Sequence, residues 1–505
     1  MRVLFLLLVV FSLEAAPKKV VASQESSLLS SLDKNSVADH LALHKLYPDT
    51  PEGKEALRRA WKLLGGEQTP LALPPVEIGQ MISLVTNSGI KKEMHLTLPQ
   101  IEAIEALSKN LAHTKLKGHR AKTRAEVLLL APEEIDIARA LLLFQFDDDE
   151  LAPQKVRAYE ATIDLMALQI RARLKPESSA AEKIEQINHF IFHEMGFRFP
   201  PHSLYAKNID AYTFLSSVLD SRRGVCLGVS ILYMACAQRL DLKLESITPP
   251  GHIFLRYKNG DDLINIETTS RGIHMDSSLY LGLGTRELQV RNLKEVVGMA
   301  FVNEASVAWQ NKDYLQSVAL YEKAQPFLEN DPLLNLLLGI NYLFIDKKSE
   351  GKKLLKAVCG KTFPGEVAPD TIAEDFLRGK VDVEGIKRSF LHVEGRDSIL
   401  AKKMELEETL RRYPHFRMGL LQLSTCYLQL GRVREAQIPL QIYHKIDPTN
   451  PTVEYYLTLI ALEQHDYNLA WKHLELTEKV TSKVDHHPAA LKETHLTLLK
   501  LAPTH

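Results

Sequence analysis

Apolar positions recur at helical spacing over most of the chain, and one central region departs from this pattern. Residues 23–125 and 297–500 are predicted to be helical, whereas residues 127–290 combine helices with short strands. A helix that leads into antiparallel strands is typical of the α+β class. We therefore predict a helical N-terminal region, an α+β core and a C-terminal all-α domain.

The centre of the α+β region is predicted to be one apolar helix followed by three short strands. The helix runs from about Cys226 to Leu240. The strands are expected at residues 244–248, 252–257 and 263–267. Asn259-Gly260 separates the last two strands, and this pair is a strong hairpin signal because both residues accept a positive φ. On its buried face, the helix is expected to place Val229, Leu232, Cys236 and Leu240.

The C-terminal domain shows an internal repeat. Tyr413-Pro414 and Asp447-Pro448 lie 34 residues apart, and Gly431 and Ala436 occupy positions of the tetratricopeptide pattern between them. Two repeat units are predicted before about residue 358 and two after residue 413. Residues 360–400 match poorly and are either a degenerate unit or a linker. Such units stack into a solenoid with a concave binding surface, so we expect a protein or peptide partner here.

The N-terminus resembles a secretory signal. Arg2 supplies a positive charge, an apolar run follows from Val3 to Leu13, and Ala15 is a small residue at the expected cleavage position. The run is shorter than the roughly 20 residues that a spanning helix needs. We predict a signal peptide at residues 1–15, with cleavage after Ala22 and an uncleaved anchor as alternatives. The mature protein would then be exported without membrane attachment, to the periplasm or cell envelope if the source is Gram-negative.

Composition narrows the range of partners. The 505 residues carry a formal net charge of −1 and show no basic stripe, whereas nucleic-acid-binding proteins usually show one. We therefore expect no nucleic acid as a partner. Four cysteines are too few for a disulfide scaffold in a chain of this length. Two of them, Cys236 and Cys426, lie on apolar helix faces and are predicted to be buried.

Cys226 differs from those two because it lies at a predicted helix start, after Gly224. The N–H groups and dipole of a helix N-terminus favour a thiolate. His252 is predicted at the start of one strand, and Glu267 at the end of the next. Such residues can converge as nucleophile, base and orienting acid. Each also has a structural alternative, namely a core thiol, a hydrogen-bonded imidazole and a solvated carboxylate.

The sequence RRGVCLGVSILYMACAQRLDLKLESITPPGHIFLRYKNGDDLINIETTSRG resembles the transglutaminase-like, papain-related superfamily. That superfamily places a Cys at a helix start after Gly, then a strand His, then an acid on the next strand. More narrowly, the run from about Val127 to Gly272 followed by repeats resembles the bacterial SirB family. The resemblance implies a transglutaminase-like α+β core, with Cys226, His252 and Glu267 as the catalytic triad of an acyl-transfer reaction.

Two departures from those families bear on activity. Many SirB-like members lack the Cys, so the presence of Cys226 favours an intact site. The acid is Glu267 where the wider superfamily usually has Asp, and Asn265 is a weaker candidate for the same role. No side chain is identified for oxyanion stabilisation, so the backbone N–H of Cys226 is the expected donor.

Two functions remain open at this stage. The first is a cysteine hydrolase or acyltransferase of amide or peptide substrates, with repeats that recruit them. The second is a non-catalytic binding scaffold with a relic transglutaminase-like fold. A metal-dependent enzyme is a weaker alternative, because His189 and His193 share one helix face but have no evident third ligand. We expect that pair to be buried at a domain interface, and we predict neither a metal site nor a cofactor.

Overall fold

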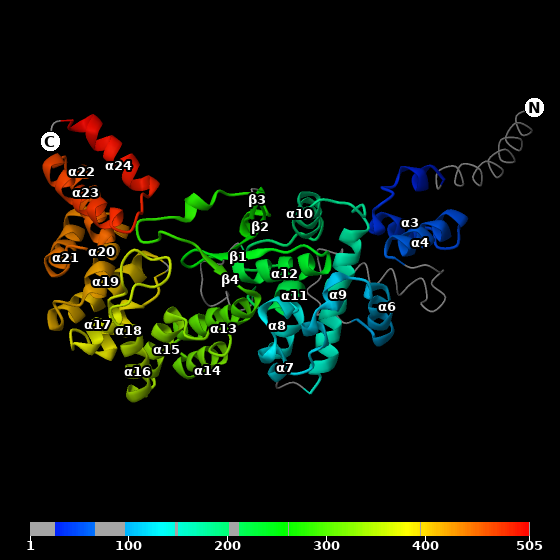
Figure 1. The fold of residues 1–505 in the computed structure, drawn as a ribbon, viewed down its shortest axis with the longest axis horizontal. Helices are drawn as coiled ribbons and strands as arrows, with labels where there is room; N and C mark the ends of the chain where they lie inside the picture. Colours follow the sequence, from blue (N-terminus) through cyan, green and yellow to red (C-terminus); the bar gives the residue numbers. More distant parts are fainter. Residues whose placement is uncertain are drawn as a thin grey trace, which may run out of the picture.

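The computed structural model describes residues 26–65, 96–146, 150–200, 212–260, 262–393 and 395–503. The predicted signal peptide and part of the predicted N-terminal region lie outside these residues. Figure 1 shows an elongated molecule: α3 (Val37–Leu46) and α4 (Pro51–Leu63) lie at one end, the α+β part occupies the middle, and the C-terminal helices curl round at the other end. None of the described helices is both long and apolar enough to cross a membrane.

The described N-terminal residues form helices and 3₁₀ turns. Helices α3 and α4 each begin after a hydroxyl residue whose side chain accepts a hydrogen bond from the first turn, Ser36 for α3 and Thr50 for α4. The elements are α3 (Val37–Leu46), α4 (Pro51–Leu63), α6 (Leu98–Ser108), the 3₁₀ turns η1 (Ala112–Lys115) and η2 (Lys117–Arg120), and α7 (Arg124–Leu129).

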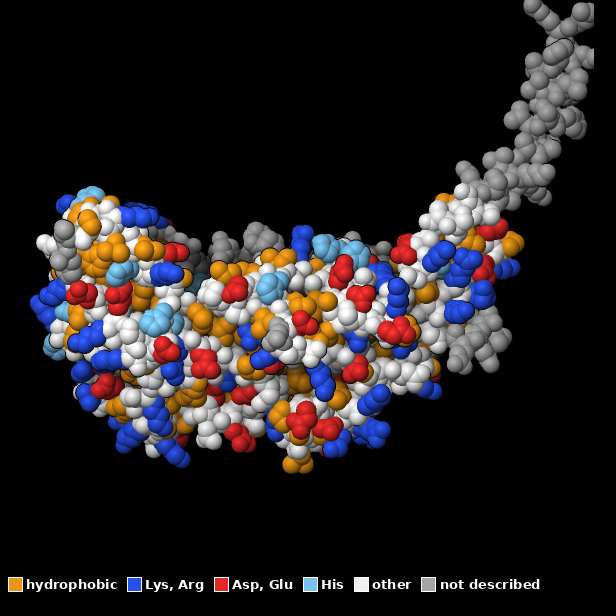
Figure 2. Space-filling view, turned by 45° about the horizontal axis from the view of Figure 1, so that its top comes forward, with side chains coloured by type: hydrophobic (Ala, Val, Ile, Leu, Met, Phe, Trp, Pro, Cys, Tyr) orange, Lys and Arg blue, Asp and Glu red, His pale blue; other side chains and the backbone are white. Residues whose placement is uncertain are grey.

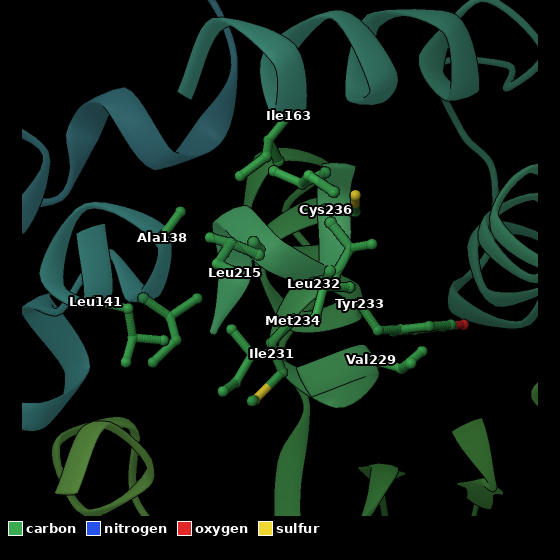
Figure 3. Close-up of a cluster of buried hydrophobic side chains, with 14 of the residues drawn as sticks. Ala138, Leu141, Ile163, Leu215, Val229, Ile231, Leu232, Tyr233, Met234 and Cys236 are labelled. Atoms are coloured by element: carbon green, nitrogen blue, oxygen red, sulfur yellow. The ribbon is translucent and has the colours of Figure 1, made fainter. Parts of the chain in front are cut away.

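The core of the α+β part is built around the predicted apolar helix, α12 (Cys226–Arg239). It is buried along nearly its whole length, which is wider than the single face that the sequence predicted. Figure 3 shows its side chains meeting those of α8, α9 and α11. The helices around it are η3 (Pro132–Glu134), α8 (Ile137–Gln145), α9 (Ala152–Arg171), α10 (Ala180–Asn188), the π-helical turn η4 (His189–Glu194) and α11 (Leu215–Ser221).

A four-stranded antiparallel sheet follows α12, in the order β3-β2-β1-β4. Gly260 has a φ of 60° in the predicted hairpin. Asn259 still pairs with Asp262, so the turn lies one residue later than predicted. Two 3₁₀ turns, η7 (Thr268–Ser270) and η8 (Ser277–Tyr280), lie between the last two strands. The strands are β1 (Glu245–Thr248), β2 (Phe254–Asn259), β3 (Asp262–Ile266) and β4 (Gln289–Arg291).

The C-terminal domain is a stack of helical hairpins, so the predicted fold class is confirmed. Four pairs of consecutive helices pack closely: α13 with α14, α15 with α16, α20 with α21, and α22 with α23. The helices are α13 (Leu293–Gln310), α14 (Tyr314–Ala324), α15 (Pro332–Phe344), α16 (Lys348–Val358), α17 (Ile372–Leu377), α18 (Val383–Ser389), α19 (Arg396–Arg412), α20 (Arg417–Gln429), α21 (Val433–Ile446), α22 (Pro451–Glu463), α23 (Tyr467–Ser482) and α24 (Ala489–Leu501).

The stretch that matches the repeat pattern poorly contains two short helices, α17 and α18. It is fixed to the following repeats by a buried ion pair between Asp375 and Arg417. On the surface, acidic and basic side chains are interspersed over the face shown in Figure 2, as the near-zero net charge leads one to expect. The predicted burial of Cys236 and Cys426 is confirmed.

Candidate active site

Cys226 is the first residue of α12, as the sequence predicted. The backbone just before it is tightly packed: a Cβ at Gly224 would lie 2.5 Å from Val229 Cγ2 and 3.0 Å from Val229 N. Only glycine therefore fits at this position without displacing the helix. The N–H of Val225 donates to the carbonyl oxygen of Tyr212 at 3.1 Å, which fixes the entry into the helix. The Cys226 side chain stays partly exposed, as a nucleophile requires.

His252 follows a tight turn and comes just before β2. The turn is closed by a hydrogen bond from the His252 N–H to the Pro249 carbonyl at 3.1 Å, with Gly251 at a φ of 70°. The imidazole Nε2 lies 2.7 Å from Oε2 of Glu267. Cys226 lies near enough to the imidazole to raise the pKa of His252. The structure thus brings the three predicted residues together.

Glu267 lies one residue beyond β3 and is only 3% exposed. Its Oε1 accepts hydrogen bonds from the backbone N–H of Thr269 at 3.0 Å and from the Thr269 hydroxyl at 2.6 Å. Its Oε2 accepts from His252 and from the hydroxyl of Tyr280. Because both oxygens are occupied, the carboxylate is held in one orientation toward the imidazole.

The electrostatics of the pair favour a protonated histidine. Burial lowers the pKa of His252, but the interactions with Cys226 and Glu267 outweigh it and raise this pKa to about 10. Burial raises the pKa of Glu267, but the hydrogen bonds from His252, Thr269 and Tyr280 outweigh it and lower this pKa to about 2. At neutral pH the imidazolium therefore holds a proton between the sulfur and the carboxylate.

Tyr280 is a site residue that sequence reasoning missed. Its ring stacks on His252, with centroids 5.7 Å apart, and on Phe254, with centroids 4.9 Å apart. Its hydroxyl donates to Glu267, and burial together with this hydrogen bond raises the pKa of Tyr280. Tyr280 lies in η8, 13 residues after Glu267, and no motif or periodicity marks this position.

Asn265 does not orient the histidine. Its Nδ2 donates to the Met275 carbonyl at 2.6 Å and to the Ser277 hydroxyl at 2.9 Å, and its Oδ1 accepts from Arg256 Nε at 3.0 Å. Asn265 therefore holds the loop that carries Tyr280 against the sheet. This geometry does not support Asn265 as the alternative to Glu267 for orienting His252.

The loop after Tyr280 reaches the C-terminal repeats. His486 Nε2 donates to the carbonyl oxygen of Gly282 at 2.8 Å, and the N–H of Arg286 donates to the carbonyl oxygen of Gly365 at 2.8 Å. In Figure 1 this loop runs out from the sheet toward α24 before it returns to β4. Tyr280 is thus held between the sheet on one side and the repeat domain on the other.

His189 and His193 lie outside this site. Their rings stack with centroids 5.8 Å apart, and His189 Nε2 lies 3.0 Å from Glu194 Oε1. The prediction that they are buried at an interface is wrong, since the His193 side chain is exposed and both histidines line an open pocket of about 1030 Å³. Cys226, His252 and Glu267 do not line this pocket.

Comparison with known proteins identifies the part of the chain that holds the site. Residues 157–281 match the family model of the transglutaminase-like superfamily. The matched segment contains the three predicted residues and Tyr280. The chain is also similar to the UPF0162 proteins of two Xylella fastidiosa strains, Temecula1 and 9a5c, each 21% identical over 134 residues. That region is 26% of this chain and 45% of each relative, so the similarity spans less than half of their length.

Solved structures similar to this chain include helical repeat proteins. A tetratricopeptide repeat protein of Thermus thermophilus, TTC0263, is 14% identical, with 41% of this chain and 100% of that protein covered and a TM-score of 0.21. The type IV pilus biogenesis factor PilW is 15% identical, with coverages of 41% and 86% and a TM-score of 0.23. The chain combines a segment that matches the transglutaminase-like model with a C-terminal stack of helical hairpins.

Proposed function

We propose that the transglutaminase-like domain is a cysteine hydrolase or acyltransferase that acts on amide bonds of a protein or peptide. The observation that carries this proposal is the contact set of Cys226, His252 and Glu267. A partly exposed thiol at a helix start lies beside an imidazole that a buried carboxylate orients. This is the arrangement of nucleophile, base and orienting acid that acyl transfer needs.

The first half of the reaction forms an acyl-enzyme. The Cys226 sulfur attacks the amide carbonyl, and the C–N bond breaks as His252 gives its proton to the leaving amine. The N–H groups at the start of α12 are placed to stabilise the oxyanion that develops, because a helix N-terminus carries unsatisfied donors and a positive dipole end. The product of this half is a thioester on Cys226 and a free amine.

The second half releases the acyl group. Water or an amine attacks the thioester while His252 takes a proton from it, and the Cys226 sulfur leaves. Glu267 keeps its charge throughout and stabilises the imidazolium each time it forms. Its four hydrogen bonds support this role, since they hold the carboxylate ionised and fixed.

The repeat domain is proposed to bind the protein or peptide on which the site acts. Such solenoids present extended surfaces to partners. The loop between Tyr280 and β4 contacts the repeats, so a partner bound there would lie close to the segment that holds Glu267. We also propose that the protein is exported, which rests on the apolar N-terminal run between Val3 and Leu13.

The second candidate function is a binding scaffold without catalysis. It is favoured by large apolar side chains that stay exposed on the repeat helices, among them Leu315, Met404 and Ile438. A scaffold needs no reactive thiol, so the two functions predict different reactivities for the Cys226 thiol.

The test compares two thiols in one molecule. Cys226 and Cys359 are both partly exposed, and only Cys226 has an imidazole partner in the described site. Limiting iodoacetamide at pH 6, followed by peptide mass spectrometry, should label Cys226 at least about tenfold faster than Cys359, because the thiolate is the nucleophile. His252→Ala should remove this difference. Equal labelling of the two thiols in the wild type would contradict the enzymatic proposal and leave the scaffold.

A further inference from the structure

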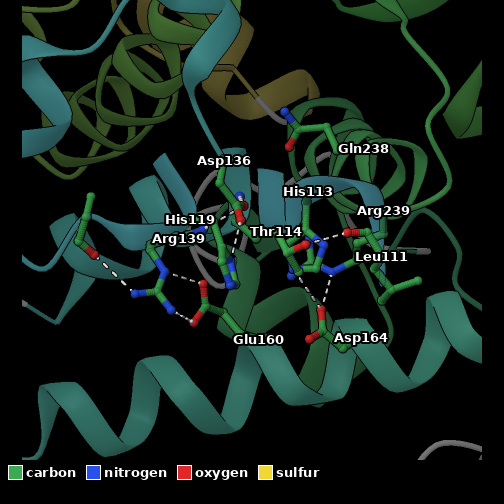
Figure 4. Close-up of polar contacts among 12 residues, drawn as sticks. Leu111, His113, Thr114, His119, Asp136, Arg139, Glu160, Asp164, Gln238 and Arg239 are labelled. Carbon is green, nitrogen blue, oxygen red and sulfur yellow. Dashed lines mark hydrogen bonds and ion pairs between the residues drawn. The ribbon is translucent and has the colours of Figure 1, made fainter. Parts of the chain in front are cut away.

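A second polar cluster lies where the N-terminal part meets the α+β part, away from Cys226. It joins His113 of η1, His119 of η2 and Asp136, the residue that precedes α8. The two rings meet edge to face with centroids 4.7 Å apart. One potential ligand atom from each of the three residues lies within 4.8 Å of the other two. Figure 4 shows these side chains grouped above α9, which contributes Glu160 and Asp164 to the same region.

The polar atoms of this cluster are buried and lack hydrogen-bond partners. This holds for both ring nitrogens of His113, for Nδ1 of His119 and for Oδ2 of Asp136. His113 is 1% exposed and Asp136 is fully buried. Buried polar groups are nearly always satisfied in native proteins, so this group of three side chains needs a missing partner.

Charge balance points to a cation as that partner. Arg139 forms a double hydrogen bond with Glu160, at 2.8 and 2.5 Å. Arg239 donates to Asp164 at 2.6 Å. Asp136 has no such arginine partner: its Oδ1 caps α8, and its Oδ2 lies 3.5 Å from His119, which is long for a hydrogen bond. The charge of Arg239 attracts Asp136 from a distance, but no cationic group among the described residues is in direct contact with this fully buried carboxylate, which is costly.

The histidines are suitable as ligands. His113 is buried and its Nδ1 has no hydrogen-bond partner among the described residues, so this nitrogen is available to an ion. Asp164 Oδ1 lies 3.3 Å from His113 Nε2. A carboxylate in that position orients a ligating imidazole in many metal sites.

We propose that His113, His119 and Asp136 bind a divalent transition-metal ion, with Zn²⁺ as the best fit. Two imidazoles and one carboxylate are a common donor set for this ion, and donors at roughly 2.0–2.2 Å in a tetrahedron lie about 3.3–3.5 Å from one another. The 3.5 Å between His119 Nδ1 and Asp136 Oδ2 matches such an edge. The ion enters past His119, whose side chain is 28% exposed.

The ion would tie η1 and η2 to the start of α8. η1 packs against α12, and Arg239 at the end of α12 contacts Asp164 in the same network. The site therefore lies at the opposite end of α12 from Cys226 and has a structural role. It is independent of the proposed catalytic function.

A second group of histidines in the repeats serves as the control. His444 Nδ1 lies 2.6 Å from Oε1 of Glu454, and His473 Nδ1 lies 2.7 Å from Oε2 of the same carboxylate. The Nδ1 atom of each histidine has its own carboxylate oxygen at hydrogen-bond distance, so these two nitrogens are satisfied without an ion. A His473→Gln variant thus removes a buried histidine of similar setting without touching the proposed site.

The test measures zinc in the full chain, purified without a histidine tag, saturated with ZnCl₂ and passed over a chelating resin. Plasma mass spectrometry should find about one zinc ion per chain in the wild type and in His473→Gln. A site with three protein ligands holds zinc tightly. His119→Gln and Asp136→Asn should each lose most of it. Asp136→Asn keeps an oxygen that can cap α8, and circular dichroism at 20 °C verifies folding of both variants.

Substitution with Co²⁺ provides a second readout. The wild type should show the intense visible bands of tetrahedral cobalt, and His119→Gln should not. The proposal is overturned if the folded wild type retains no zinc, or if His473→Gln loses the ion while His119→Gln keeps it. If a variant fails to fold, weak bands typical of octahedral cobalt in the wild type would overturn the proposal by themselves.

Discussion

The Tyr280 hydroxyl donates a hydrogen bond to Oε2 of Glu267, the same oxygen that faces Nε2 of His252. The tyrosine ring also covers the imidazole and stacks on Phe254. Tyr280 is therefore a positioning residue for the acid and the base at once. The loop that carries it is held by Asn265 on the sheet side and by the repeats on the other.

Tyr280→Phe removes the hydroxyl and keeps the stacked ring. We expect the free energy of unfolding to fall by about 1.5–3 kcal/mol, because a hydrogen bond to a buried carboxylate is lost. We also expect His252 to hold its proton less firmly, so Cys226 alkylation at pH 7 should slow. Urea denaturation and alkylation rates measure the two effects. Tyr257→Phe in β2, outside the site, is the control, and an equal effect of both variants would refute the positioning role.

The ion pair of the site predicts a specific pH dependence of stability. The pKa of Glu267 is lowered from an ordinary 4.5 to about 2, so its contribution is present above pH 4.5 and is lost as the pH falls toward 2. The pKa of His252 is raised from 6.5 to about 10, so its contribution is present below pH 6.5 and is lost as the pH rises toward 10.

Comparison of the wild type with Glu267→Gln isolates the contribution of Glu267 to stability at low pH. When the pH falls from 5 to 2, the free energy of unfolding measured with urea should decrease by up to about 3 kcal/mol more in the wild type than in the variant. Each pKa unit corresponds to about 1.4 kcal/mol. Other carboxylates titrate in both proteins and cancel in the difference. Parallel pH curves for the two proteins would mean that Glu267 is not ionised in the folded state as described.

Gly224→Ala tests the close packing before the nucleophile. The new methyl group would lie 2.5 Å from Val229 Cγ2, so the start of α12 must shift. We expect a loss of about 1–3 kcal/mol in the free energy of unfolding, as for other overpacked positions, together with slower Cys226 alkylation. Gly395→Ala is the control, because nothing lies within 4 Å of a Cβ there. An unchanged alkylation rate in Gly224→Ala would show that the helix start tolerates displacement.

Asp375→Asn tests what fixes the short helix α17 to the repeats. Both carboxylate oxygens of Asp375 accept from Arg417, which is 8% exposed. The substitution leaves a buried guanidinium with less counter-charge, so we expect a loss of about 3 kcal/mol in thermal or urea unfolding. Glu408→Gln breaks an exposed pair with Arg411 and should cost under about 1 kcal/mol. Similar losses in both variants would contradict this account.

Local signals in the sequence predicted much of the fold and the three residues of the candidate site. Gly224 and the apolar run after it placed Cys226 at a helix start, and Asn259-Gly260 predicted the hairpin that brings Glu267 beside His252. These features depend on neighbours in the chain, and the order of the residues resembles a known superfamily. Short-range patterns of this kind are what sequence reasoning captures.

Features that depend on loop paths were not predictable. Tyr280 reaches Glu267 only because residues 271–280 return to the site, and no periodicity records such a path. His113, His119 and Asp136 converge from two 3₁₀ turns and a helix cap, at spacings that match no common metal motif. The wrong prediction for His189 and His193 has a similar origin, since one helix face alone does not say what covers it.

The most direct test of the central claim is the pH dependence of Cys226 alkylation in the purified full chain. Rates are measured from pH 5 to 9 for the wild type and for His252→Ala, with Cys226→Ser to subtract the other thiols. The account predicts a wild-type rate at least about tenfold above that of His252→Ala at pH 6, because a neighbouring imidazolium favours the reactive thiolate. A wild-type rate that rises about tenfold per pH unit up to the ordinary thiol range near 8.5, and that matches His252→Ala, would contradict it.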